Sequence, residues 1–133
     1  MLQQNTVLIV SASGKDDLVL RKVLNEAGMH VRLAASCAEA LDAMTSDTPP
    51  SIVFSDATLP DGTWTDVLTF AGGGSSRIPV IVVSRVVDVN LYINAIEQGA
   101  ADFVVPPFFR QDLSYVMNSA MRENLAIQTP AAA

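Results

Sequence analysis

The segment Ile52-Val53-Phe54-Ser55-Asp56 is a short apolar run that ends in a carboxylate. Its apolar residues are consecutive rather than alternating, which is typical of a strand buried on both faces, as in a parallel sheet. Four similar runs, mostly of β-branched or other apolar residues, occupy residues 7–10, 31–34, 80–83 and 103–105. The sequence therefore predicts five buried parallel strands, with Asp56 at the end of the third.

Between and after these strands lie stretches whose apolar residues recur at i, i+3, i+4 and i+7, the spacing of one face of an amphipathic helix. They cover residues 20–27, 37–44, 64–71, 89–96 and 113–121. Gly28 and Gly99 each follow such a stretch, where a glycine commonly ends a helix, and Ser36 with Glu39 forms a capping box. Strict alternation predicts an α/β doubly wound, flavodoxin-like fold with strand order 2-1-3-4-5 and helices on both faces.

Composition limits the class of protein. The chain has 133 residues, half of them hydrophobic and 17% charged, which suits one folded domain. We expect that domain over residues 1–126 and a flexible tail or the start of a linker over 127–133. The net charge of −6 argues against direct nucleic-acid binding. Without a signal peptide or a membrane-length apolar run, we expect a cytoplasmic protein with no membrane contact.

The chain has one cysteine, Cys37, and one histidine, His30, so neither an internal disulfide nor a cysteine-rich or multi-histidine metal site is expected. We expect Cys37 to be a small core residue of the second helix and His30 to lie at the surface at the start of the second strand. Trp64 is expected to be packed, and Phe103 to be buried or half-buried.

Residues that directly follow the strands carry function in this fold, because the carboxyl ends of the strands form its crevice. The residues at these positions are Ser11, Ala12, Asp56, Ser84, Pro106 and Pro107. A carboxylate in such a crevice can act as a nucleophile or a ligand. A cap or turn residue is the plainer interpretation of Asp56, and its position alone leaves both open.

Several motifs stand in a recognisable order. They are Val7-Leu8-Ile9-Val10, Ser55-Asp56 with Leu59-Pro60-Asp61-Gly62, Ile78-Pro79-Val80-Ile81-Val82-Val83-Ser84, Gln98-Gly99-Ala100-Ala101-Asp102-Phe103-Val104-Val105 and Pro107-Phe108. Through them the chain, from about residue 6 to residue 123, resembles the receiver domain of two-component response regulators. The resemblance implies that Asp56 accepts a phosphoryl group from a histidine kinase. It further implies that Ser84 bonds this group and moves toward it, and that Phe103 changes rotamer in step.

The resemblance also implies a Mg²⁺ ion, held by two acidic residues after the first strand together with the acceptor, and a lysine after the fifth strand. In this chain the acidic pair falls on Ser11 and Ala12, and the lysine falls on Pro106. Phosphoryl transfer depends on positioning and on cations that neutralise charge, and Mg²⁺ prefers carboxylate oxygens. We therefore expect no cofactor, doubtful Mg²⁺ binding and a poor acceptor at Asp56. Ser84 would then have only Asp56 or water to bond.

Three nearby charged residues are candidate substitutes for the missing acidic pair and the missing lysine. Asp16 and Asp17 fall in the first turn of the first helix, where negative charge suits the helix dipole better than it suits a metal site. Arg85 directly follows Ser84, and either forms a salt bridge to Asp56 or is a solvated loop arginine.

We predict a pseudo-receiver: a non-enzymatic signal-transduction module of a phosphorelay that acts through contacts with proteins such as a sensor histidine kinase or an output domain. The alternative is a phosphorylatable receiver that uses Asp56. Enzymes with the same layout fit less well. A haloacid-dehalogenase-type phosphatase needs a second aspartate where Thr58 stands, and Ser11-Ala12-Ser13-Gly14 only faintly matches the phosphate loop of a flavodoxin.

Two further expectations concern the last third of the chain. We predict a cis bond between Pro106 and Pro107, because such a bond turns the chain after the fifth strand of receivers. The fourth helix is apolar nearly all round, and exposed apolar faces usually mark an interface. We expect Val87, Leu91 and Tyr92 to form a contact surface, in a homodimer through the fourth helix, the fifth strand and the fifth helix.

Overall fold

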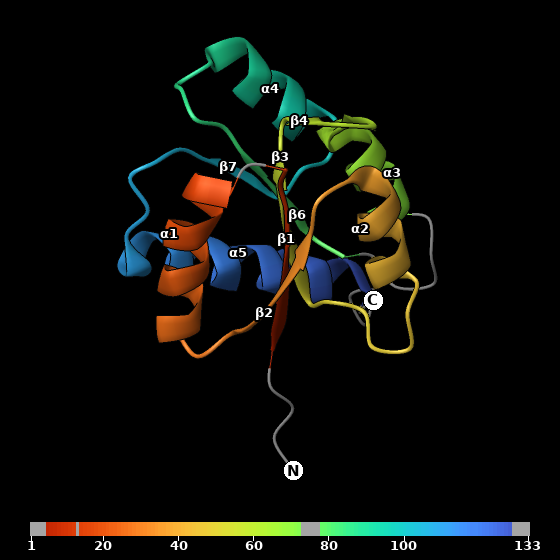
Figure 1. The fold of residues 1–133 in the computed structure, drawn as a ribbon, viewed down its shortest axis with the longest axis horizontal. Helices are drawn as coiled ribbons and strands as arrows, with labels where there is room; N and C mark the ends of the chain where they lie inside the picture. Colours follow the sequence, from red (N-terminus) through yellow and green to blue (C-terminus); the bar gives the residue numbers. More distant parts are fainter. Residues whose placement is uncertain (1–4, 13, 73–77, 129–133) are drawn as a thin grey trace.

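The computed structural model describes residues 5–12, 14–72 and 78–128, with the side chains of residues 14–17 and 122–128 outside that description (Figure 1). The elements are β1 (Thr6–Val10), α1 (Gly14–Glu26), β2 (His30–Ala34), α2 (Cys37–Met44), β3 (Ile52–Asp56), β4 (Thr58–Leu59), β5 (Gly62–Thr63), α3 (Trp64–Gly72), β6 (Val80–Val83), α4 (Val89–Glu97), β7 (Asp102–Val104) and α5 (Arg110–Gln128). The last five residues of the predicted tail lie outside the described residues.

Five parallel strands form the main sheet in the order β2-β1-β3-β6-β7, which confirms the predicted order. Helices cover both faces, with α1 and α2 on opposite sides of the sheet in Figure 1. Right-handed crossovers between parallel strands place the helices in this way. No described helix is long and apolar enough to cross a lipid bilayer.

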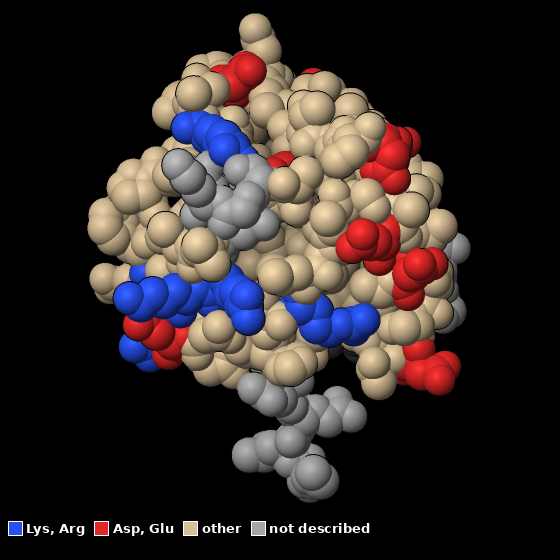
Figure 2. Space-filling view, viewed as in Figure 1, with Lys and Arg blue, Asp and Glu red and all other residues tan. Residues whose placement is uncertain are grey.

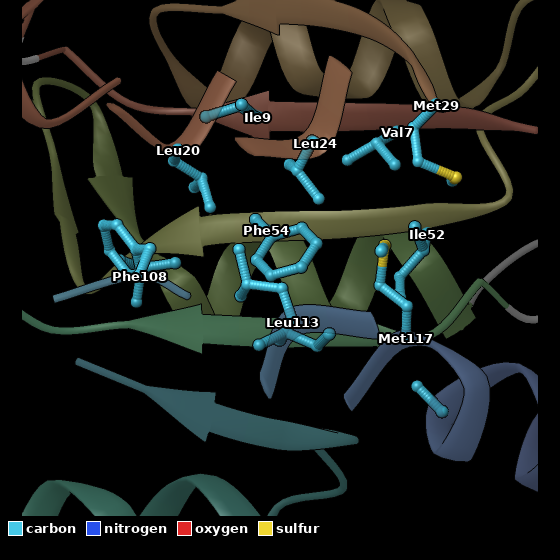
Figure 3. Close-up of a cluster of buried hydrophobic side chains, with 13 residues drawn as sticks. Val7, Ile9, Leu20, Leu24, Met29, Ile52, Phe54, Phe108, Leu113 and Met117 are labelled. Carbon is cyan, nitrogen blue, oxygen red and sulfur yellow. The ribbon is translucent and has the colours of Figure 1, made fainter. Parts of the chain in front are cut away.

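Strand β3 shows why the apolar runs are continuous. Ile52 and Phe54 face the side covered by α1 and α5, whereas Val53 faces the side covered by α2 and α3. Because successive side chains of a strand point to opposite faces, a strand covered on both faces needs apolar residues throughout. Figure 3 shows Phe54 between Leu24 of α1 and Leu113 of α5.

The predicted helix boundaries are confirmed at three points. Gly28 and Gly99 end α1 and α4 with φ angles of 88° and 106°, in the left-handed region that favours glycine. The hydroxyl of Ser36 accepts the backbone N–H of Glu39 at 3.1 Å, as the N-cap of α2. The carboxylate of Glu39 reaches back to the N–H of Ala35 rather than to that of the capping residue.

A small antiparallel hairpin, β4 with β5, begins two residues after Asp56, where the sequence indicated only a turn. Each of its strands has two residues, which is too short for any periodic pattern to show in the sequence. Leu59 of β4 is buried against α2 and α3, so the hairpin is packed rather than projecting. The segment that leaves the end of β3 is thereby held against the second face of the sheet.

Helix α4 carries an exposed apolar face, as predicted, but Leu91 does not belong to it. Leu91 is half-buried and packs against the cluster that contains Trp64 and Ala95. Leu91 and Ala95 are four residues apart and therefore share the face of α4 that lies against the body of the domain. The exposed apolar residues of this region are Val86, Val87, Val89, Tyr92, Ile93 and Ile96.

Candidate functional site

A hollow of about 350 Å³ lies where the carboxyl ends of the central strands meet. It is lined by Ala12, Asp56, Ala57, Thr58, Val83, Ser84 and Arg85. These residues lie at or just after the carboxyl ends of β1, β3 and β6, which are neighbours in the sheet. The crevice is therefore at the strand ends where the fold predicts it, and it brings together Ala12, Asp56 and Ser84 as the sequence suggested.

Asp56 is the last residue of β3, and its side chain is 18% exposed. The hydroxyl of Ser11, a buried residue directly after β1, donates to Oδ2 of Asp56 at 2.5 Å. A hydrogen bond from a hydroxyl to a carboxylate is typically this short and is stronger than a neutral one. Ser11 thus supplies a proton donor where the family pattern has a carboxylate.

The described side chains of this hollow supply few of the oxygen ligands that Mg²⁺ prefers. Asp56 is the one carboxylate among its lining residues, and Ala12 offers a methyl group at the second position of the acidic pair. Among the described residues, no group of three or more His, Cys, Asp or Glu side chains comes together as a metal site would require. The side chains of Asp16 and Asp17, the substitutes considered from the sequence, lie outside the description.

Arg85 brings positive charge to the hollow from the end of β6. Its Nη2 lies 3.9 Å from Oδ2 of Asp56, so the salt bridge considered from the sequence is present. The arginine side chain is 49% exposed, and ion pairs of exposed side chains contribute only about 0–1 kcal/mol. At the position of the family's lysine, the ring of Pro106 has neither charge nor donor.

The Ser84 hydroxyl bonds to the backbone of its own loop. It donates to the carbonyl of Val86 at 2.7 Å, and the N–H of Val86 points back to the same oxygen at 3.4 Å. The expectation that Ser84 has only Asp56 or water to bond was therefore wrong. Serine readily bonds to nearby backbone groups in a turn, and the loop after β6 offers it a carbonyl two residues on.

A second, apolar hollow of about 190 Å³ lies beside α4 and β7. It is lined by Val87, Asp88, Val89, Tyr92, Phe103 and Val105. Phe103 is half-buried on β7, as predicted, and the Tyr92 ring meets it edge-on, with ring centres 5.7 Å apart and planes at 73°. Aromatic pairs favour this edge-to-face arrangement. Val87 and Tyr92, two of the predicted contact residues, thus border one groove.

Asp61 has a structural role that the sequence did not reveal. From the turn of the β4–β5 hairpin, its carboxylate accepts the backbone N–H groups of Cys37 at 2.7 Å and Ala38 at 3.1 Å, at the start of α2. These hydrogen bonds hold the pKa of Asp61 below its ordinary value, since they favour the charged form. Burial, together with Asp61, raises the pKa of the Cys37 thiol to about 11.

Three expectations about burial and one about a peptide bond are also confirmed. Cys37 and Trp64 are buried, and His30 is exposed at the start of β2. The bond between Pro106 and Pro107 is cis.

Charge is unevenly distributed over the surface. Figure 2 shows acidic side chains gathered over the side where α2 lies in Figure 1, and basic side chains gathered mainly over the opposite, lower part of the same face. Helices α2 and α3 contain acidic residues and no lysine or arginine.

The chain belongs to the response regulator receiver domain family, whose model matches residues 7–118. It is 34% identical over 122 residues to the transcriptional regulatory protein KdpE of Mycobacterium tuberculosis (strain ATCC 25618 / H37Rv). That match covers 90% of this chain and 52% of KdpE, so the chain spans about half the length of this relative. It is also 27% identical over 107 residues to the DNA-binding transcriptional regulator NtrC of Proteus hauseri, covering 80% of this chain and 22% of NtrC.

Solved structures agree with this assignment. A putative response regulator from Chloroflexus aurantiacus matches with a TM-score of 0.78 and 29% identity, over 90% of this chain and 99% of that one. A response regulator receiver domain protein from Clostridium thermocellum has the same fold, with a TM-score of 0.80 and 22% identity over 92% of this chain and 98% of that one. The protein is therefore a receiver domain of the two-component type, a class of signalling module that is generally not enzymatic.

Proposed function

We propose that this receiver domain is an interaction module with a degenerate phosphorylation site, which acts through protein–protein contacts. The observation that carries the proposal is the environment of Asp56. Its Oδ2 receives the hydroxyl of Ser11 at 2.5 Å and lies 3.9 Å from the guanidinium of Arg85. The protein's own donors thus engage one oxygen of the carboxylate.

The missing charges explain why transfer to Asp56 would be slow. A phosphoryl group adds a charge of about −1.5 to −2, and its transfer relies on cations close to its oxygens. With Ser11 and Ala12 after β1, no carboxylate pair is available there to help Asp56 hold Mg²⁺. The absence of that pair also removes the like-charge repulsion that the ion would offset.

A phosphorylatable receiver is the second candidate, and Arg85 is the observation in its favour. The guanidinium already lies near Asp56 and could neutralise part of the charge of a phosphoryl group in place of the missing lysine. Because the Arg85 side chain is half-exposed and its Nη2 lies as far as 3.9 Å from Oδ2 of Asp56, we place this candidate second.

The partner we propose is a sensor histidine kinase or an output domain. KdpE and NtrC are named as transcriptional regulators, and the part that matches this chain is only 52% and 22% of their length. A receiver in such a protein transmits its state to another protein surface. The acidic balance of this chain argues that it would not itself bind DNA.

We further propose that two copies associate through α4, β7 and α5. Three apolar residues of this region are exposed: Val87 by 79%, Val89 by 62% and Ile93 by 47%. Burying a contiguous apolar face of this kind against a second copy is favourable, since it removes apolar surface from water.

A beryllofluoride titration tests the degenerate site. The chain's single tryptophan, Trp64, is buried in a cluster against which Phe103 packs, so its fluorescence reports on the switch region. We expect no saturable change in Trp64 emission when beryllofluoride and millimolar Mg²⁺ are added to the wild type, and the same flat response from Asp56→Asn. A saturable change in the wild type that Asp56→Asn lacks would favour the phosphorylatable receiver instead.

A further inference from the structure

The two edges of the main sheet, β2 and β7, differ in how far they are closed to a further strand. In β7 the carbonyl of Val104 accepts the N–H of Ser84 beside it, so the preceding residue, Phe103, directs its backbone groups outward. The carboxylate of Asp102 accepts the N–H of Phe103 at 2.7 Å. A strand added to β7 would therefore have to displace Asp102.

The edge at β2 is open. The N–H of His30 and the carbonyl of Ala34 bond to the neighbouring chain at the two ends of β1, so the residues that alternate with them, Val31 and Leu33, direct their N–H and C=O groups outward. None of the described residues bonds to these outward groups. The five residues of β2 pair one to one with β1, and neither a proline nor a bulge disrupts this edge.

The side chains of β2 give the open edge two different faces. Leu33 pairs in register with Ile9 and so lies on the face covered by α1 and α5, where it is 50% exposed. Arg32 pairs with Leu8 and so lies on the face covered by α2 and α3. Its guanidinium donates to the carbonyl of Thr48 at 2.7 Å, which uses one of its five N–H donors. An added strand would therefore meet an apolar side chain on one face and a cation on the other.

We propose that β2 is a docking edge for an extended segment of a partner protein in which apolar and acidic residues alternate. The segment pairs with the outward backbone groups of Val31 and Leu33, as in other cases of strand addition to a sheet edge. Its apolar side chains lie beside Leu33, and its carboxylates lie beside Arg32. Apolar pairs and pairs of opposite charge both stabilise neighbouring strands.

The charge of the surrounding surface also favours an acidic partner. Strand β2 lies between α1 and α2 in Figure 1, and Figure 2 shows basic side chains over the lower part of that face. Helix α1, which packs beside β2, carries the exposed residues Arg21 and Lys22. Attraction by exposed charges of this kind weakens as salt is added.

A second copy of this chain fits the docking edge less well. If two β2 strands paired antiparallel through the outward groups of Val31 and Leu33, Arg32 of one copy would stand directly opposite Arg32 of the other. Like charges directly opposite each other destabilise a pair of strands. Arg32 therefore disfavours self-pairing at the same edge where it favours an acidic segment.

Peptide titration of the whole chain, followed by NMR, tests the docking edge. The probe is a synthetic peptide in which valine and glutamate alternate, long enough to span β2, and the matched peptide has lysine in place of glutamate. We expect the glutamate peptide to shift the amide signals of Val31 and Leu33 saturably and to slow their hydrogen exchange. The lysine peptide should bind at least about fivefold more weakly, since one cross-strand charge pair changes affinity by up to about that factor.

Two substitutions separate the backbone contribution from that of charge. Leu33→Pro removes an outward N–H at an edge position that tolerates proline, and it should abolish binding. Leu33→Ala keeps that N–H and should weaken binding by no more than about fivefold. Arg32→Glu should reverse the preference, so that the lysine peptide binds more tightly than the glutamate peptide. Arg110→Glu, at an exposed arginine where α5 begins, is the control and should leave the preference unchanged.

Four results would overturn the docking edge. They are an unchanged preference in Arg32→Glu, signal changes centred on β7 instead of β2, no binding of either peptide at millimolar concentration, and association of the wild-type chain through β2 without peptide. None of these measurements involves phosphorylation, so their outcome is independent of whether Asp56 is a working acceptor.

Discussion

At the scale of single residues, Asp56 and Asp61 differ in the kind of group that contacts their carboxylates. Asp56 is engaged by side chains, the Ser11 hydroxyl and the Arg85 guanidinium, so its contacts can be exchanged as those side chains move. Asp61 is engaged by two backbone N–H groups at the start of α2, which stay in place as long as the helix does. The backbone contacts of Asp61 therefore join the β4–β5 hairpin to the start of α2, whereas the side-chain contacts of Asp56 can change.

The Asp61 contact predicts a pH-dependent stability. Since folding lowers the pKa of Asp61, its contribution is present above its ordinary pKa of 3.8 and is lost as pH falls through the lower folded value. We expect Asp61→Asn to lower the melting temperature at pH 7, with a difference from wild type that shrinks below about pH 4. Thermal unfolding, monitored by circular dichroism, measures this difference in melting temperature. Asp47→Asn, at an exposed site after α2, is the control and should show no such trend.

The sequence could predict Asp56 and Ser84 as site residues because each stands directly at the end of a strand, and strand ends meet at one edge of a parallel sheet. It could not predict the role of Asp61, whose partner Cys37 is 24 residues away and is reached only through a hairpin too short to leave a pattern. Nor could it orient the Ser84 hydroxyl, which depends on the local path of the loop to Val86.

At the scale of elements, the strands and helices follow from periodicity because each buries a long enough apolar face. Strand β3 is the clearest case, since α helices cover both of its faces and Phe54 is fully buried. Helix α4 shows the limit of the same reasoning. A helix that is apolar nearly all round does not reveal which residues turn inward, and packing against Trp64 and Ala95 assigns Leu91 to the buried face.

The burial of Phe54 predicts a large loss of stability on truncation. Phe54→Ala should lower the free energy of unfolding by about 3–5 kcal/mol, because it removes apolar contacts from both α1 and α5 and leaves a cavity. Urea unfolding measures the change. Val19→Ala, at a residue 52% exposed on α1, should stay within about 0.5 kcal/mol of wild type. A loss at Phe54 no larger than that at Val19 would mean that the core is not packed as described.

The exposed face of α4 predicts how self-association responds to charge. If two copies meet there, Val87→Glu combined with Ile93→Glu should shift the protein toward monomer, since buried carboxylates would lack partners. Sedimentation equilibrium over a range of concentrations gives the dissociation constant. Leu18→Glu places a charge on an equally apolar site of α1, 63% exposed, and should leave association unchanged. An equal effect of both changes, or a wild type that stays monomeric throughout, would contradict the proposed dimer.

At the scale of the whole molecule, the chain keeps the receiver layout, and we propose that it has replaced the charges that phosphoryl transfer needs. The fold rests on apolar clusters on both faces of the sheet. Val83 of the crevice belongs to one of these clusters, whereas Ser11, Ala12 and Pro106 belong to neither. Ser11, Ala12 and Pro106 could therefore depart from the family pattern without cost to the architecture.

Restoring the lost carboxylates should restore metal binding. Because the backbone layout of the crevice is intact, the variant with both Ser11→Asp and Ala12→Asp should bind Mg²⁺ more tightly than the wild type. Adding Asp56→Asn to this variant should abolish the gain in affinity. Calorimetric titration with Mg²⁺ measures the affinity of each protein. Equal affinity of the wild type and the double aspartate variant would show that the crevice differs from a receiver site in more than its charges.

Phosphoryl incorporation at Asp56 tests the central claim most directly. The chain is incubated with acetyl phosphate and millimolar Mg²⁺, and the intact mass of the wild type is compared with that of Asp56→Asn. We predict that neither protein gains a phosphoryl group, because Ser11, Ala12 and Pro106 supply none of the charges that transfer needs. A stable gain of one phosphoryl group by the wild type, absent from Asp56→Asn, would contradict the degenerate site and establish a working receiver.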